Sequence, residues 1–236
     1  MPMPTTTFPA PPTAPSKRLG ATTTDDRRVA IRGVPWDVYK RLSEAIGDQH
    51  VRLNYDGKDL EIMAPGLEHE DWKLWVTLFL DAVMLACHIR GRLGGQTTWR
   101  RPGVERGLEA DQCGWFDPEK VATVKRLRES GVKDMGLYPV PQLAIEIDIS
   151  TPEIDRPAIY SGLGIDEIWR MDGEAVVFEQ LGADGQYMAV EESRFLPVRT
   201  SDVLAWMTAK DAGEPEWRVR LAQWAAGLAA AGGNED

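Results

Sequence analysis

The stretch Leu143–Arg156, LAIEIDISTPEIDR, decides the expected fold, because it has the pattern of a core strand that carries two carboxylates. Side chains alternate between the two faces of a strand. Ile145 and Ile147 therefore share the face that we expect to pack inward, whereas Glu146 and Asp148 share the other. A strand buried on both faces should be apolar on both. We therefore expect the carboxylate face to open on a cleft or on solvent.

The remaining sequence predicts a mixed sheet flanked by helices. Helical spacing of apolar residues marks the segments 39–46, 68–90, 155–164, 200–210 and 214–231. Strand patterns mark a hairpin around Asp56-Gly57 and the segments 94–101, 108–117, 166–172, 174–181 and 186–193. The charged segment 118–138 suits a surface excursion. This order of elements is typical of an α/β or α+β domain with a central sheet.

The composition predicts one domain preceded by a tail. Residues 1–27 are rich in Pro and Thr and cannot bury enough surface to offset the entropy of ordering, so we expect a disordered segment there. The domain is expected over 28–236, with C-terminal helices from about residue 200. Three tryptophans of these helices are expected to pack on the core, with a dimer face as the alternative; they are Trp206, Trp217 and Trp224.

Charge and cysteine content narrow the functional classes. The chain of 236 residues is 43% hydrophobic, so it can bury a core, and it has no apolar run long enough to span a membrane. Its first residues lack the apolar middle of a signal peptide, and its two cysteines cannot build a disulfide framework, so a cytoplasmic protein is expected. The net charge of −10 argues against a surface that attracts nucleic acid everywhere, although a local basic cleft remains compatible with it.

A second acidic strand indicates a metal site. Asp111, in the segment 108–117, can point the same way as Glu146 if the two strands are neighbours. Two carboxylates that face one point are costly unless a cation or a proton relieves their repulsion, and oxygen ligands suit Mg²⁺ and Mn²⁺. Glu70 begins the long helix, where it could be a further ligand or an ordinary partner of the helix dipole. The alternative for the whole pattern is a solvated face of a one-sided sheet.

Longer segments resemble a known family. TTWRRPGVERGLEADQCGWF (97–116) and PQLAIEIDISTPEIDRPAIYSGLGIDEIWRMDG (141–173) are similar to the Uma-type restriction endonuclease family of bacteria, in the PD-(D/E)XK nuclease superfamily. The resemblance runs from about Arg28 to the C-terminal helices and is most specific over 155–170. It implies a restriction-endonuclease-like core, with a mixed sheet flanked by helices. It also implies Mg²⁺-dependent or Mn²⁺-dependent hydrolysis of nucleic acid, with DNA favoured and a homodimer natural for cutting two strands.

The resemblance also assigns roles to residues. Asp111 and Glu146 would bind the metal, with Glu70 as an accessory ligand. Asp148 stands where the superfamily has Lys, and Arg156 on the following helix would take over the positive charge. Arg stays protonated and is a poor general base, but it can stabilise a pentacovalent phosphate. Activation of the attacking water would then fall to the metal, helped by Asp148.

Two rival functions follow from the same residues. Asp148 in place of Lys, together with the acidic charge, favours a catalytically weakened binding or assembly module that keeps the nuclease fold. A metal-dependent hydrolase that acts on something other than nucleic acid is the other rival. Basic side chains that could follow a phosphate path, each with a solvated charge as the alternative, are Arg100, Arg101, Lys120, Lys125, Arg126, Arg128 and Lys133. Trp99 or Trp115 could stack on bases, with a place in the core as the alternative.

Overall fold

The computed structural model describes residues 26–47, 49–95, 97–101, 105–209 and 214–232. Almost all of the predicted tail therefore lies outside the described residues. The predicted class is confirmed, because helices flank a six-stranded sheet that contains both parallel and antiparallel pairs. None of the helices within the described ranges combines the length and the apolar character needed to cross a membrane.

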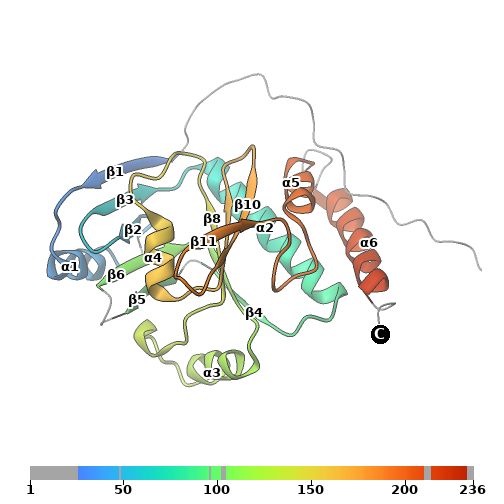
Figure 1. The fold of residues 1–236 in the computed structure, drawn as a ribbon, viewed down its shortest axis with the longest axis horizontal. Coiled ribbons are helices and arrows are strands. Elements are labelled where there is room, and N and C mark those ends of the chain that lie inside the picture. The colour runs from blue at the N-terminus through green and yellow to red at the C-terminus, as the bar shows by residue number, and fades with distance from the viewer. Residues whose placement is uncertain (1–25, 48, 96, 102–104, 210–213, 233–236) are drawn as a thin grey trace, which may run out of the picture.

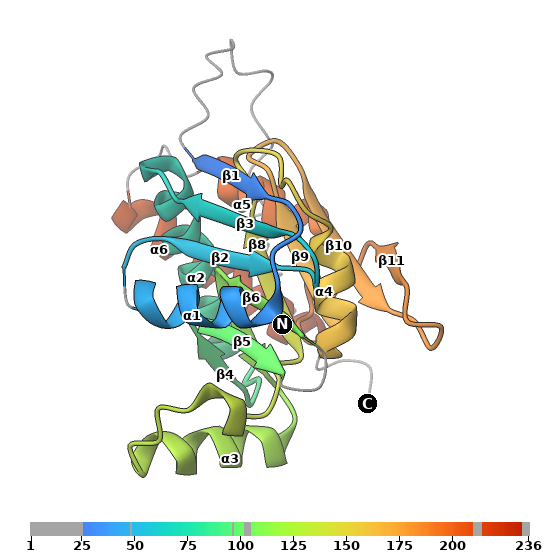
Figure 2. The ribbon, with the colours of Figure 1, turned by 90° about the vertical axis from the view of Figure 1, so that its left-hand side faces the viewer.

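The strands form two sheets, where the sequence suggested one central sheet. The five-stranded sheet has, in spatial order, β1 (Arg27–Ile31), β3 (Leu60–Ala64), β2 (Arg52–Tyr55), β6 (Arg106–Ala110) and β5 (Thr97–Arg101). The six-stranded sheet has β11 (Tyr187–Val190), β10 (Val176–Leu181), β9 (Glu167–Met171), β8 (Leu143–Ile147), β7 (Gln112–Trp115) and β4 (Arg92–Gly94). Figure 2 shows the five-stranded sheet from its outer side.

Asp111 is the point at which the chain passes from one sheet to the other. It is the single residue between β6, which pairs with β2 and β5, and β7, which pairs with β4 and β8. The sequence predicts one continuous strand over 108–117, and alternation by itself carries no sign of a change of sheet. The residue predicted to bind metal therefore lies at the junction of the two sheets.

The helices cover the sheets from several sides (Figure 1). They are α1 (Trp36–Ile46), α2 (Leu67–Ala86), α3 (Pro118–Glu129), α4 (Arg156–Leu163), α5 (Thr200–Thr208) and α6 (Glu214–Gly232), with a short 3-10 helix at Met135–Leu137. Within the segment expected as a surface excursion, α3 is a well-capped helix. The side chain of Asp117 accepts hydrogen bonds from the amides of Glu119 and Lys120, and Pro118 follows directly after this cap.

The largest core lies between the six-stranded sheet and the helices α2, α5 and α6. Ile145 and Ile147 are fully buried in it, as the alternation along β8 predicts. The three C-terminal tryptophans also belong to this core, so their predicted packing is confirmed; they are Trp206, Trp217 and Trp224. The parallel pair β8–β9 is joined through α4, the usual kind of connection between parallel strands. This crossover places α4 beside the carboxylate-bearing face of β8.

Gly107 on β6 tests how tightly the five-stranded sheet packs against α1. Tyr39 stacks on Tyr55 with ring centroids 4.9 Å apart, and its hydroxyl lies directly over Gly107. A methyl group at this position would overlap the hydroxyl. We expect Gly107→Ala to lower the free energy of unfolding by about 1–3 kcal/mol, the usual cost of overpacking. Urea unfolding measures this, with Gly95→Ala as control because a Cβ there meets nothing within 4 Å. Equal stability of the two variants would contradict the packing described here.

Candidate functional site

The predicted metal ligands Asp111 and Glu146 lie side by side. β7 pairs with β8 so that Gln112 is opposite Ile145, and this antiparallel register places Asp111 opposite Glu146. The amide of Asp111 donates to the carbonyl of Ile145 at 3.1 Å. The amide of Ile147 in turn donates to Oδ2 of Asp111 at 2.8 Å. Both the backbone and the side chain of Asp111 are therefore held against β8.

The carboxylate face is buried at Glu146, where the expectation of a cleft or solvent is wrong, and it borders a hollow only at Asp148. Asp111 is 0%, Glu146 1% and Asp148 9% exposed. Strands β1 and β2 of the five-stranded sheet, together with α4, supply side chains that contact these three carboxylates. Buried carboxylates are costly unless opposite charges or donors surround them. The groups that compensate them therefore define the site.

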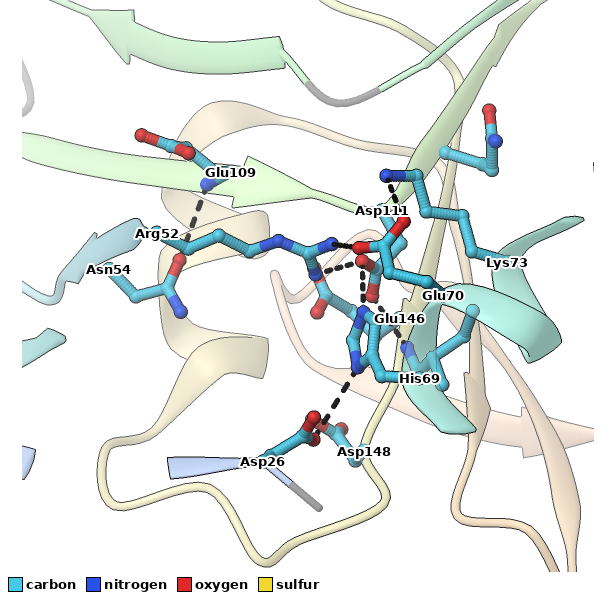
Figure 3. A network of polar contacts seen from close by, with 12 residues as sticks. Asp26, Arg52, Asn54, His69, Glu70, Lys73, Glu109, Asp111, Glu146 and Asp148 are labelled. Atoms are coloured by element: carbon cyan, nitrogen blue, oxygen red, sulfur yellow. Dashed lines mark hydrogen bonds and ion pairs between the residues drawn. The ribbon is translucent and has the colours of Figure 1, made fainter. Parts of the chain in front are cut away.

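Arg52 on β2 is the first of these groups. Its guanidinium donates to Oδ1 of Asp111 and, at 3.5 Å, to Oε1 of Glu70 near the start of α2 (Figure 3). Burial lowers the pKa of Arg52, and the charge of Glu146 is the strongest influence that opposes this shift. Two of the carboxylates predicted to bind a metal, Asp111 and Glu70, thus contact one guanidinium, and the third, Glu146, acts on it through its charge.

Arg156, the first residue of α4, is the second compensating group. One terminal nitrogen donates to Glu146 and, at 2.8 Å, to Oδ1 of Asp148, and the other donates to Oε1 of Glu61 at 2.8 Å. Burial alone would lower the pKa of Arg156, but these three carboxylates raise it. The predicted charge-bearing residue therefore lies beside Glu146, with its side chain only 3% exposed.

Helix α4 holds Glu146 with two donors one turn apart. Arg156 binds Oε2, and the hydroxyl of Tyr160 donates to Oε1. Asp155 caps the helix by accepting from the amide of Ala158 at 3.2 Å. Burial raises the pKa of Glu146 to about 7, with Arg156 acting against the shift and Asp148 adding to it. The ionised form of Glu146 thus depends on the arginine.

Asp148 occupies the position at which the superfamily pattern has Lys, and it lies between two arginines. Its Oδ1 accepts from Arg156 and, at 3.2 Å, from Arg28 on β1. Arg28 also donates to Oε1 of Glu61 at 3.1 Å. The negative charge of Asp148 is therefore neutralised by positive charge from both α4 and the edge of the five-stranded sheet.

His69 is a fully buried partner of Asp111. Its Nε2 is 2.7 Å from Oδ1 of Asp111, and its Nδ1 is 3.4 Å from Oδ2 of Asp26. Burial lowers the pKa of His69 despite the nearby carboxylates, which favours the neutral imidazole. A neutral imidazole donates from one nitrogen only, and the shorter contact assigns that proton to the bond with Asp111. The structure thus places this histidine against a predicted metal ligand.

The oxygen donors suit a hard divalent cation, because Asp111 and Glu70 already accept from one positive group and Glu146 lies opposite Asp111. In the structure that group is the guanidinium of Arg52. Over the described ranges, no three His, Cys, Asp or Glu side chains come close enough together to hold an ion. Asp111, Glu146 and Glu70 could therefore share an ion only if Arg52 withdrew from between them.

Sequence reasoning missed several residues of this site. Arg52, Glu61 and Arg28 are charged residues within strands, and Lys73 on α2 donates to Oε2 of Glu70 at 3.1 Å. The available signal was the alternation of Arg52 and Glu61 with apolar neighbours, in RLNY (52–55) and LEIMA (60–64). This is the same pattern as in β8. Alternation marks such positions but does not say which other strand faces them.

The aromatic residues considered for base stacking belong to the core. Trp99 and Trp115 are 2% and 1% exposed, and their rings meet edge to face with centroids 5.6 Å apart. Neither ring offers a free face to a base. Basic side chains on or after α3 are exposed; they are Lys125, Arg126, Arg128 and Lys133. The side chains of Arg100 and Arg101 lie outside the described part of the structure.

Comparison with known proteins places the fold. No family model matches the chain, and no curated protein matches it. Among solved structures, the chain is similar to one from Anabaena variabilis ATCC 29413 that is described as "a putative nuclease belonging to DUF820". The two are 13% identical, with a TM-score of 0.50 over 74% of this chain and 99% of the other. At this identity the likeness shows a shared fold, a mixed sheet flanked by helices.

The pH dependence of stability tests the ion network around Glu61. Burial alone would raise the pKa of Glu61, but Arg156 and the other donors lower it from 4.5 to about 2. A carboxyl with a depressed pKa in the folded state stabilises the fold above its unfolded pKa, and this contribution is lost as the pH falls from about 5 toward 2. We expect Glu61→Gln to lower the free energy of unfolding by on the order of 2–3 kcal/mol at pH 7 and by less at pH 3.

Urea unfolding at both pH values measures this difference. Glu153→Gln is the matched control, because the side chain of Glu153 is 53% exposed and its ion pair with Arg32 is 3.9 Å long. An effect of Glu61→Gln that is equally large at pH 7 and pH 3 would contradict the ion network as the source of the stability.

Proposed function

We propose that this protein is a metal-dependent nuclease that hydrolyses phosphodiester bonds of DNA. The observation that carries the proposal is that Asp111 and Glu70 both accept from Arg52, while Glu146 lies opposite Asp111 on the neighbouring strand. A similar fold in a protein described as "a putative nuclease" supports the same reading. Carboxylates from three segments near one cationic position are the donor set of a magnesium or manganese site.

Asp111, Glu146 and Glu70 would hold the ion, Mg²⁺ or Mn²⁺, after Arg52 withdraws. An ion in this place would lower the pKa of a bound water and neutralise charge on the phosphate. Asp111 is already oriented for this role by the amide of Ile147 and by His69. Such outer contacts typically tune the affinity of a ligand for its metal.

The charges around Glu146 would keep it a ligand despite its burial. Arg156 and Tyr160 both donate to its carboxylate, which favours the ionised form that binds metal. Arg156 would also offset negative charge that develops near Glu146 during the reaction. Asp148, which shares Arg156, would assist in orienting the attacking water. In this scheme no Lys is needed on β8.

A second function, a binding or assembly module without catalysis, is favoured by one specific observation. Every carboxylate oxygen of Asp111 and Glu146 accepts a hydrogen bond from a protein donor. A site neutralised in this way is stable without an ion. The net charge of −10 also makes weak, salt-sensitive binding of nucleic acid the expectation for either function. We expect a cytoplasmic protein, and a homodimer would suit cleavage of both strands.

Substitution of the two central carboxylates tests the catalytic proposal. We expect Asp111→Asn and Glu146→Gln each to reduce DNA cleavage in Mg²⁺ or Mn²⁺ at least about 100-fold, because a neutral amide is a much weaker ligand. Thermal unfolding establishes that each variant is folded. Asp81→Asn is the control, since Asp81 lies on the exposed surface of α2. Turnover like that of the wild type in either folded variant would rule out the site.

The position of Arg52 makes metal binding itself testable. If the ion takes the place of the guanidinium, Arg52→Gln should bind Mn²⁺ about tenfold or more tightly than the wild type in isothermal calorimetry, because the competing charge is gone. Arg170→Gln is the matched control, because Arg170 pairs with Glu179 and not with these carboxylates. Absence of binding to either protein at millimolar Mn²⁺ would contradict the metal site and favour the non-catalytic module.

A further inference from the structure

We propose that Lys73, on the first half of α2, contacts the phosphate group of the nucleic-acid substrate. The inference rests on the nuclease function proposed above and adds a residue that neither the strand pattern nor the family resemblance points to. It follows from the partial exposure of Lys73 and from a series of contacts that leads from this side chain to the buried carboxylate of Asp111.

Lys73 is the outermost member of a chain of contacts that leads to Asp111. Its Nζ lies 3.1 Å from Oε2 of Glu70, and Oε1 of the same carboxylate is 3.5 Å from a terminal nitrogen of Arg52. Arg52 then donates to Asp111. Figure 3 shows Lys73 and Glu70 on the same side of Asp111, projecting from α2. A group that binds to Lys73 is thus next to Glu70 and is separated from Asp111 by Glu70 and Arg52.

Exposure separates Lys73 from the other cations that contact these carboxylates in the described part of the chain. Its side chain is 19% exposed and that of Glu70 33%, whereas Arg28, Arg52 and Arg156 are each 4% exposed or less. A phosphodiester is a bulky anion and cannot reach the buried guanidiniums in this conformation. It would meet Lys73 first.

A second approach to the acidic residues is less suited to an anion. Asp148 lines a hollow of about 260 Å³ together with Asp172 and Arg170. Both carboxylate oxygens of Glu179 accept from Arg170, at 2.8 and 3.0 Å, so the positive charge there is already neutralised. Asp148 is likewise neutralised by Arg156 and Arg28, and Asp172 adds a negative charge, so this hollow does not attract a phosphate. The partly exposed ammonium of Lys73 is therefore the more favourable contact for an anion.

The chemistry of the ammonium group fits this role. Lys carries three donors on a compact charge, and Glu70 uses one of them, so others remain for a phosphate oxygen. The superfamily pattern has Lys at the position of Asp148, directly after β8. Asp148 contributes no positive charge. Lys73 would supply from a helix the accessible cation that this strand lacks, next to a ligand of the proposed metal.

The pair formed by Lys73 and Glu70 should contribute little to stability. Partly exposed pairs three residues apart on a helix stabilise it by about 0.2–0.5 kcal/mol. A variant that loses the charge of Lys73 is therefore expected to fold. A change in DNA binding by this variant would then report on a contact between Lys73 and the DNA, because loss of the ion pair with Glu70 changes the stability of the fold very little.

Lys73→Met tests the contact, with Lys73→Arg as the conservative variant. The matched control is Lys40→Met, because Lys40 is also a helix lysine, exposed on α1 with its Nζ 5.9 Å from the centroid of the Trp36 ring, and is not among the candidate phosphate contacts. Affinity for a fluorescein-labelled DNA duplex is measured by anisotropy over a range of salt concentrations, without added metal. We expect Lys73→Met to bind about tenfold more weakly and to reduce the salt slope by about one, as loss of one phosphate contact does. Lys73→Arg should retain most of the slope.

Cleavage measured in parallel separates the two proposals. If the wild type cleaves DNA and Lys73→Met matches it in cleavage, affinity and salt slope, the role of Lys73 is overturned and the nuclease function stands. If the wild type binds DNA without cleaving it and Lys73→Met loses affinity and slope, the phosphate contact stands and the nuclease function fails. A wild type that does not bind the duplex even at low salt contradicts both.

Discussion

The buried ion pair between Asp111 and Arg52 is the contact on which the arrangement of the molecule depends. Asp111 is the single residue between β6 and β7, where the chain leaves one sheet and enters the other. Its carboxylate also accepts from His69 on α2 and from the backbone of Ile147 on β8. A buried carboxylate that loses its partners costs several kcal/mol. The two sheets and α2 must therefore keep their alignment for this charge to remain compensated.

A second arginine extends the same constraint to α4. Arg156 joins Glu146 and Asp148 of the six-stranded sheet to Glu61 of the five-stranded sheet. Arginine suits such a place, because its planar group remains charged when buried and donates to several oxygens at once. The same guanidiniums that stabilise the site also occupy its carboxylates. Under the proposed function, binding of an ion would therefore require Arg52 to move away from Asp111 and Glu70.

Much of the fold followed from local patterns. The alternation in β8 predicted the inward packing of Ile145 and Ile147, and helical spacing predicted α2 and the C-terminal helices. The adjacency of Asp111 and Glu146 followed from two acidic strands once these were assumed to pair. The sequence did not indicate the change of sheet at Asp111, because the residues of β6 and β7 together have the pattern of one uninterrupted strand. Nor did it indicate α3, although Asp117-Pro118 is a common start of a helix.

The sequence by itself determined which residues could share a face, because alternation and helical spacing are properties of the backbone that need no partner. It thereby identified Glu146 and Asp111 as paired acids, whereas Arg156 was assigned a place near them by the family resemblance. Only the tertiary structure decided that the carboxylates are buried and that Arg52 and Glu61 meet them. These contacts join strands distant in sequence, and each depends on the twist and register of two sheets. The charge balance of a buried site is a property of the surrounding elements together, and no one segment carries it.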